Sequence, residues 1–136
     1  MKSNPFDKYL KPEQTLQIQV CQYIEIKYPR AVIYHSPNEG KRSAFEQYLL
    51  RKMRVLSGFP DLVILDYKLI LFIELKVLKS GKKQPNQIWW IDILNRFGFP
   101  AYFCFGFDEA IRVIDKHLSI KHISNESTKS NVGAGI

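Results

Sequence analysis

The sequence has only two cysteines, no long apolar run and fewer acidic than basic side chains. Cys21 and Cys104 lie far apart and outside any Cys-x-x-Cys spacing, which argues against a zinc site and predicts two buried free thiols. No stretch approaches the roughly eighteen uninterrupted apolar residues of a membrane span. The first ten residues, MKSNPFDKYL, also lack the apolar centre of a signal peptide. We therefore expect a soluble, cytoplasmic protein with no membrane partner.

The shortage of acidic residues gives the chain a positive charge. Its 20 Lys and Arg residues outnumber 13 Asp and Glu residues, so the formal net charge is +7. This balance favours a polyanionic partner such as nucleic acid. A length of 136 residues predicts one domain, and 46% hydrophobic residues are enough for one packed core.

The spacing of the apolar residues predicts an α/β fold, with a mixed four-stranded sheet flanked by helices. We expect helices at 12–27, 44–56, 85–97 and 108–118, and strands at 31–35, 62–65, 69–73 and 101–105. Residues 1–11 are interpreted as an N-terminal arm. Residues 121–136 are polar and rich in Ser and Gly, which predicts a disordered tail. The domain itself is then expected to span residues 12–120.

Residues 58–76 contain two apolar strands with a short polar connection, which predicts a β-hairpin. If Tyr67 and Lys68 form a two-residue loop, the antiparallel ladder places Asp61 opposite Glu74. A four-residue loop about the same centre would keep this pairing. A three-residue loop would not, because a slip of one residue sends Glu74 to the other face of the sheet.

Three polar side chains of this hairpin are expected on one face. Side chains alternate along a strand, so Glu74 and Lys76 point the same way as Asp61. Opposed carboxylates repel each other, and a buried pair would normally take up a proton. Mg²⁺ is usually held by one or two carboxylates together with water and phosphate oxygens. The pair Asp61 and Glu74 therefore predicts a site for Mg²⁺ or Mn²⁺, with an ammonium group beside it.

These residues also resemble the motifs of a nuclease family. Pro60-Asp61, followed after twelve residues by Glu74-Leu75-Lys76, resembles the PD-(D/E)XK motif. Its flanking motifs occur in the order typical of the VRR-NUC branch, especially its small stand-alone phage and bacterial members. They are Glu13-x-x-x-Gln17, Ser-Pro-Asn-Glu-Gly-Lys-Arg at 36–42, Gly58-Phe59-Pro60-Asp61, and Gln87 followed by Trp90. The resemblance covers roughly residues 12–115.

The resemblance implies a restriction-endonuclease-like core and a Mg²⁺- or Mn²⁺-dependent endonuclease that hydrolyses DNA phosphodiesters. It assigns the metal to Glu13, Asp61, Glu74 and the carbonyl of Leu75, and further catalytic roles to Lys76 and Gln87. Lys76 would position or deprotonate the attacking water, or stabilise charge on the phosphorane. As a base it would have to lose its proton, which two neighbouring carboxylates oppose, so electrostatic stabilisation is favoured.

Several of these residues also have simpler interpretations. Glu13 would complement the dipole of its helix as a first-turn acid, and Gln87 would be an ordinary surface residue. Lys41 and Arg42 either contact phosphate or belong to a solvated loop, and the same holds for Asn38. For the basic loop after Lys76, phosphate contact is favoured. Its candidate residues are Lys79, Lys82 and Lys83.

Small stand-alone VRR-NUC proteins are similar to Holliday-junction resolvases, which cut symmetric strands as homodimers. The resemblance therefore implies a branched or junction DNA substrate and a homodimer. Three alternatives remain open from the sequence. They are a PD-(D/E)XK nuclease without junction specificity, a nucleic-acid-binding module with this fold but no activity, and a basic structural protein with ordinary salt bridges.

Overall fold

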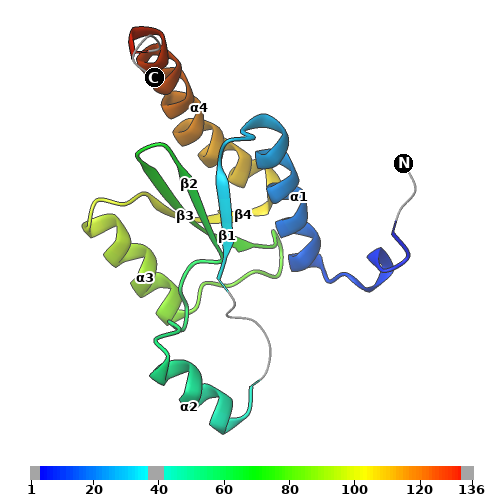
Figure 1. The fold of residues 1–136 in the computed structure, drawn as a ribbon. Coiled ribbons are helices and arrows are strands. Elements are labelled where there is room, and N and C mark those ends of the chain that lie inside the picture. The colour runs from blue at the N-terminus through cyan, green and yellow to red at the C-terminus, as the bar shows by residue number, and fades with distance from the viewer. Residues whose placement is uncertain (1–3, 37–41, 133–136) are drawn as a thin grey trace.

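The computed structural model describes residues 4–36 and 42–132. Figure 1 shows a central sheet with helices on both sides. In chain order the elements are η1 (Asp7–Tyr9), α1 (Pro12–Lys27), β1 (Val32–His35), α2 (Ala44–Lys52), β2 (Leu62–Asp66), β3 (Leu69–Lys76), α3 (Pro85–Arg96), β4 (Ala101–Phe105) and α4 (Gly106–Val132). Within the described residues, no helix combines the length and the apolar character needed to cross a membrane.

The sheet has the strand order β1-β2-β3-β4. The first three strands are antiparallel and β4 runs parallel to β3, which confirms the predicted mixed four-stranded sheet. One face carries the larger core, in which α1 and α4 pack on the apolar side chains of β2 and β3. The other face is covered by α3 through Phe72, Leu94 and Ala101. Alternate residues of β3 therefore belong to two different cores.

The predicted hairpin register is confirmed. Leu62 pairs with Ile73 and Asp66 with Leu69, so Tyr67 and Lys68 form the two-residue loop. Lys68, the second residue of the loop, adopts a left-handed backbone conformation with φ of 56°, whereas the first, Tyr67, does not, so the loop is not one of the primed turns that hairpins favour.

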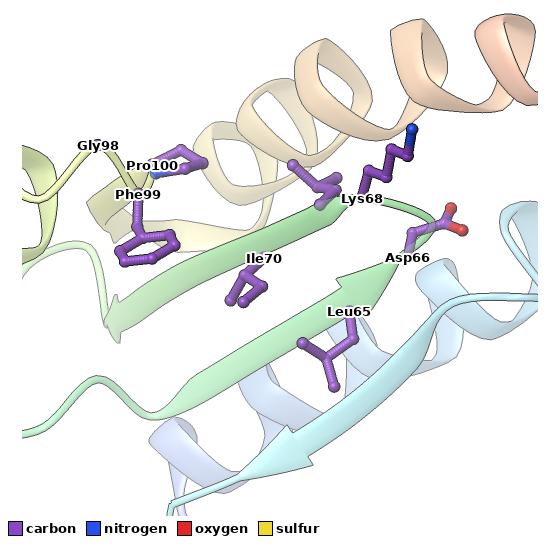
Figure 2. A pocket seen from close by; sticks show the side chains of 8 residues that line it. Leu65, Asp66, Lys68, Ile70, Gly98, Phe99 and Pro100 are labelled. Carbon is purple, nitrogen blue, oxygen red and sulfur yellow. The ribbon is translucent and has the colours of Figure 1, made fainter.

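A pocket of about 490 Å³ opens at this hairpin end of the sheet. It lies between Leu65, Ile70 and the segment containing Phe99 (Figure 2). The predicted acidic pair belongs to the opposite ends of β2 and β3, roughly 17 Å along the strand. This pocket is therefore separate from the candidate site.

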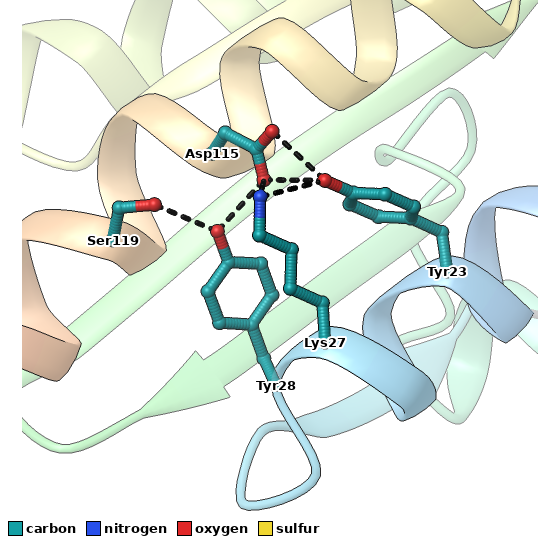
Figure 3. A network of polar contacts seen from close by, with 5 residues as sticks. All are labelled: Tyr23, Lys27, Tyr28, Asp115 and Ser119. Atoms are coloured by element: carbon teal, nitrogen blue, oxygen red, sulfur yellow. Dashed lines mark hydrogen bonds and ion pairs between the residues drawn. The ribbon is translucent and has the colours of Figure 1, made fainter.

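A network of hydrogen bonds joins α1 to α4 on the sheet face that carries the larger core (Figure 3). Asp115 accepts hydrogen bonds from the hydroxyls of Tyr23 and Tyr28 and from the ammonium of Lys27, and Tyr28 also contacts Ser119. Burial raises the pKa of Asp115, but these hydrogen bonds outweigh it and hold the pKa below its usual value. The network fixes the packing of the two helices on the sheet face away from α3.

Two helices differ from the expected ranges by more than one residue. α2 ends at Lys52 instead of residue 56, because the chain turns at Met53 and Arg54, where Arg54 has a φ of 69°. α4 starts at Gly106 and continues to Val132, through most of the segment expected to be a disordered tail. No Gly or Pro interrupts the sequence between Phe107 and Val132, so nothing there ends the helix. Residues 133–136 lie outside the described part of the chain.

Candidate active site

The two predicted acids meet at the open end of the hairpin. Asp61 directly precedes β2, and continuing the observed register places it opposite Glu74 of β3. The Glu74 carboxylate accepts a hydrogen bond from the Asp61 backbone N–H at 3.0 Å. The Asp61 carboxylate accepts one from the Leu75 backbone N–H at 3.0 Å. Each acid therefore reaches across to the other strand, and the two side chains are held together.

Glu74 is the buried member of the pair, with 3% of its surface exposed. Burial first, and then the negative charge of Asp61, raise the pKa of Glu74 to about 8, although the ammonium of Lys76 acts in the opposite direction. The Lys76 Nζ lies 3.6 Å from Glu74 Oε1. Both causes act in the direction expected for a buried pair of opposed acids, because each disfavours the charged form of the Glu74 carboxyl group.

Gln87 completes the surroundings of Glu74 from α3. Its Nε2 donates to Glu74 Oε1 at 2.8 Å, while its Oε1 accepts the backbone N–H of Gln84 at the start of the helix. The second bond fixes which end of the amide faces the glutamate. Gln87 is therefore a partner of Glu74 and is not an ordinary surface glutamine. The side chain of Gln87 therefore both caps the N-terminus of α3 and holds the Glu74 carboxyl group.

The turn before Asp61 rests on the same end of α3. Asn86 Nδ2 donates to Ser57 Oγ, and the indole N–H of Trp90 donates to the carbonyl of Ser57, both at 3.0 Å. Gly58 has a φ of 79°, and a Cβ added to it would lie 2.6 Å from the Asn86 side chain. The ring of Phe59 packs edge-on against Trp90. The sequence reasoning found the glycine turn but missed Ser57 and Asn86, whose contact joins residues 29 positions apart.

The end of β1 also meets Asp61. The backbone N–H of Ser36 donates to the Asp61 carbonyl at 2.9 Å, and His35 Nδ1 lies 3.1 Å from the same oxygen. The predicted phosphate-contacting segment therefore leaves the sheet directly beside the acidic pair. Two of its candidates, Asn38 and Lys41, lie outside the described residues. The third, Arg42, is half-buried.

The basic loop of residues 77–84 leaves β3 directly after Lys76. Lys79, Lys82 and Lys83 are all exposed, and the Lys83 ammonium lies 4.8 Å from the centre of the Phe103 ring. Gly81 folds back on the strand, and its backbone N–H donates to the Val77 carbonyl at 3.0 Å. Three exposed cations thus lie in the loop that follows the strand carrying Glu74.

The acidic pair fits a divalent cation, because a cation would replace the proton that Glu74 retains and cancel the repulsion from Asp61. A third acid is not assembled with them. In the described parts of the chain, no three His, Cys, Asp or Glu side chains gather as a metal-ligand group. Glu13 is exposed in the first turn of α1. The residues that lie together are thus Asp61, Glu74, Lys76 and Gln87, with the backbone of Leu75.

The two predicted free thiols belong to the larger core, Cys21 on α1 and Cys104 on β4. Both cysteines are unpaired; Cys104 is buried, as expected, whereas Cys21 is only half-buried. Burial is the main cause that raises the pKa of both thiols, to about 12 for Cys104, so neither is poised as a nucleophile.

The comparisons with known proteins agree with this geometry. The family model for the VRR-NUC domain matches residues 4–108. A solved structure described as a VRR_NUC domain protein is 26% identical, has a TM-score of 0.65, and is aligned over 81% of this chain and 92% of its own. A second, described as a VRR_NUC domain, is 18% identical with a TM-score of 0.57, covers 79% of this chain and 99% of its own, and shares the fold.

A comparison with curated proteins finds no match for the chain. The family model nevertheless covers most of the sequence, including all four strands and the residues around Glu74. The matched range therefore contains the segments that carry the candidate site. The chain belongs to the VRR-NUC domain family, and its domain is of the nuclease type.

Proposed function

We propose that the protein is a metal-dependent DNA endonuclease that hydrolyses phosphodiester bonds. The observation that carries the proposal is the buried Glu74, held against Asp61, Lys76 and Gln87 at one end of the central strands β2 and β3. A structural protein has no need for two opposed carboxylates, one of them buried, beside three exposed lysines. The family membership and the net charge of +7 support nucleic acid as the substrate.

Asp61, Glu74 and the carbonyl of Leu75 would hold one or two Mg²⁺ or Mn²⁺ ions. Bound there, such an ion supplies a Lewis acid for the phosphate and a more acidic water as nucleophile. Glu13 would join only if the first turn of α1 approached the pair. Because Glu74 retains a proton near neutral pH, loading of the site would release that proton.

The remaining side chains would act on the substrate directly or through Glu74. The Lys76 Nζ lies 3.6 Å from Glu74 Oε1, a position that suits stabilisation of charge on the phosphorane better than proton abstraction. Gln87 would hold Glu74 in one orientation by its 2.8 Å hydrogen bond. Lys79, Lys82 and Lys83, together with Asn38, Lys41 and Arg42, would contact backbone phosphates on either side of the cut bond.

We further propose branched DNA as the preferred substrate and a homodimer as the active form. One domain of this size offers little surface for grasping a junction, and two copies would present two active sites to symmetric strands. A nuclease of the same fold without junction specificity is the alternative. The described residues include no additional domain for reading a base sequence.

The test is cleavage of a synthetic four-way junction, compared with matched linear duplex and single strand, in Mg²⁺ or Mn²⁺. We expect metal-dependent, symmetric cutting of the junction by wild type and none by Asp61→Ala. Equal cutting of all three substrates would retain the nuclease and refute junction specificity. Tight binding without cutting in either metal would instead establish a binding module.

A further inference from the structure

Helix α2 presents aromatic side chains to solvent. None of its residues is buried, whereas α1, α3 and α4 each bury apolar residues against the sheet. Phe45 is 69% exposed and Tyr48 is 51% exposed. Figure 1 shows α2 apart from the sheet, at the end where β1 finishes and β2 begins. The two rings therefore add nothing to the hydrophobic cores formed by the described residues.

Basic side chains lie among these rings. A helix turns about 100° per residue, so Phe45, Tyr48 and Lys52 share one face. The ammonium of Lys52 lies 5.5 Å from the centre of the Tyr48 ring. Arg51 follows Tyr48 by three residues and is its neighbour on the helix surface, and both cations are exposed. Leu49 lies beside Phe45 with an exposed apolar side chain. We use the term α2 face for Phe45, Tyr48, Arg51 and Lys52.

The chain connects both ends of α2 to the candidate active site. Ser36, which precedes α2, donates its backbone N–H to the Asp61 carbonyl. Residues 53–60 lead from the end of α2 to Asp61, and Ser57 anchors this segment on α3. Eight residues span at most about 28 Å, which is the rise of about eight stacked nucleotides. The α2 face is therefore within reach of a strand bound at the acidic pair.

We propose that the α2 face binds unpaired bases of the DNA substrate close to the cut bond. Aromatic side chains stack on bases of any sequence, because every base has a π-face. The phosphates between those bases would bind the Arg51 and Lys52 side chains. In a duplex, neighbouring base pairs cover the base faces, so the α2 face would select a single-stranded segment. The use of this contact in cleavage rests on the proposed function, whereas the binding of bases does not.

A protein partner fits the α2 face less well. The apolar centre of a protein interface is depleted in lysine, whereas Lys52 lies between the two rings on this face. The surrounding charge also favours a polyanion. Residues 42–54 contain four basic residues and one acidic residue, Glu46, which accepts a hydrogen bond from the Ser43 hydroxyl at the start of the helix. Stacking rings among cations are the features that bind single-stranded nucleic acid.

The test measures the binding of two single strands by fluorescence anisotropy. One strand is intact, and the other has the same phosphates but abasic sugars at its central positions. A chelator prevents metal-dependent cleavage, so binding alone is measured. We expect wild type to bind the intact strand more tightly by roughly five- to a hundredfold, the range that alanine substitution gives for one stacked base.

Substitution of the rings should remove this preference. Tyr48→Ala should weaken binding of the intact strand by roughly five- to a hundredfold and leave binding of the abasic strand almost unchanged. Phe45→Ala should act in the same way, and Tyr48→Phe should retain the preference because it keeps the ring. Circular dichroism should show these variants folded, since neither ring belongs to a hydrophobic core.

Tyr67→Ala is the matched control. Tyr67 is 52% exposed, and the Lys68 ammonium lies 5.4 Å from its ring centre, much as Lys52 lies over Tyr48. It belongs to the hairpin loop, at the opposite end of β2 from Asp61. The control should bind both strands as wild type does.

Three results would overturn the proposal. The first is a wild-type protein that binds neither strand or binds both equally. The second is an equal loss on both strands in Tyr48→Ala, because a stacking ring has nothing to contact at an abasic sugar. The third is a loss in Tyr67→Ala as large as that in Tyr48→Ala, which would mean that any exposed ring contributes.

The nuclease proposal would fail separately from this one. Wild type that prefers the intact strand but cuts no DNA in Mg²⁺ or Mn²⁺ would refute the nuclease and keep the base-binding surface. Wild type that cuts DNA without this preference would do the reverse. Binding and cleavage are therefore measured on the same samples.

Discussion

Glu74 is a buried acidic residue whose pKa is raised to about 8, by burial first and then by the charge of Asp61. Only 3% of its surface is exposed, and its two carboxylate oxygens contact Gln87, Lys76 and the backbone of Asp61. The sequence predicted the opposition of the two acids, because the two-residue loop sets the register. It did not predict that Gln87 would bond to Glu74, since that contact depends on how α3 packs on the sheet.

The raised pKa of Glu74 predicts a pH-dependent stability in the absence of metal. The unfolded chain releases this proton near pH 4.5, whereas the folded protein keeps it until about pH 8. The folded state therefore binds more protons over this range, and its stability falls as pH rises from about 5 to 8. We expect a loss of a few kcal/mol across this range. Urea unfolding in the presence of a chelator measures it.

Glu74→Gln provides the control for this prediction. An amide does not titrate, so the variant should lose most of the slope between pH 5 and 8. It should also exceed the wild type in stability at pH 8. Equal slopes for the two proteins would show that Glu74 titrates normally and that its burial carries no electrostatic cost.

At the scale of the elements, the strands were predicted better than the ends of the helices. β4 has the predicted bounds, and β2 and β3 were found with the correct pairing. α2 was expected to continue to residue 56, because nothing local in the sequence marks Arg54 for a left-handed conformation. The contact between α1 and α4 shows the same limit. Asp115 of α4 accepts hydrogen bonds from Tyr23 and Tyr28, which lie 92 and 87 residues earlier, and no sequence pattern signals these contacts.

The junction of α3 with the Asp61 turn predicts unequal effects of two glycine substitutions. Both Gly58 and Gly98 have positive φ, so Ala at either should cost about 1 kcal/mol of stability. At Gly98 the added Cβ meets open space, whereas at Gly58 it would lie 2.6 Å from Asn86. Gly58→Ala should therefore be the more destabilising by at least about 1 kcal/mol, as measured by urea unfolding.

The double variant Gly58→Ala, Asn86→Ala separates the two causes. Removing the Asn86 side chain relieves the clash but not the backbone strain, so the double variant should recover part of the lost stability. Similar losses for Gly58→Ala and Gly98→Ala would contradict the close packing of the turn on α3.

At the scale of the whole molecule, the positive charge is concentrated in part around the site. The loop of residues 77–84 holds Lys79, Lys82 and Lys83 next to the strand end that carries Glu74. Replacing all three with Ala in an Asp61→Ala background should weaken DNA binding. The slope of log affinity against log salt should fall by up to about 2–3, since each phosphate contact contributes close to one. Fluorescence anisotropy across a salt series measures it.

A matched change elsewhere tests whether the position of the charge matters. Arg112 and Lys116 are exposed on α4, which packs on the sheet face away from α3. Their replacement with Ala should leave the salt slope almost unchanged. Equal effects of the two sets would mean that DNA responds to net charge alone, and would remove the basic loop from the proposed interface.

The central claim is that Asp61 and Glu74 together hold a divalent cation, and Mn²⁺ titration by calorimetry tests it most directly. Wild type should bind Mn²⁺ at pH 7 and release close to one proton, seen as a dependence of the heat on the buffer, because Glu74 is protonated before loading. Asp61→Ala should lose binding, and Gln87→Ala should weaken it by roughly ten- to a hundredfold. Glu13→Ala shows whether α1 contributes a ligand. Binding that is unchanged in Asp61→Ala and Glu74→Gln, or no binding by wild type, would contradict the account.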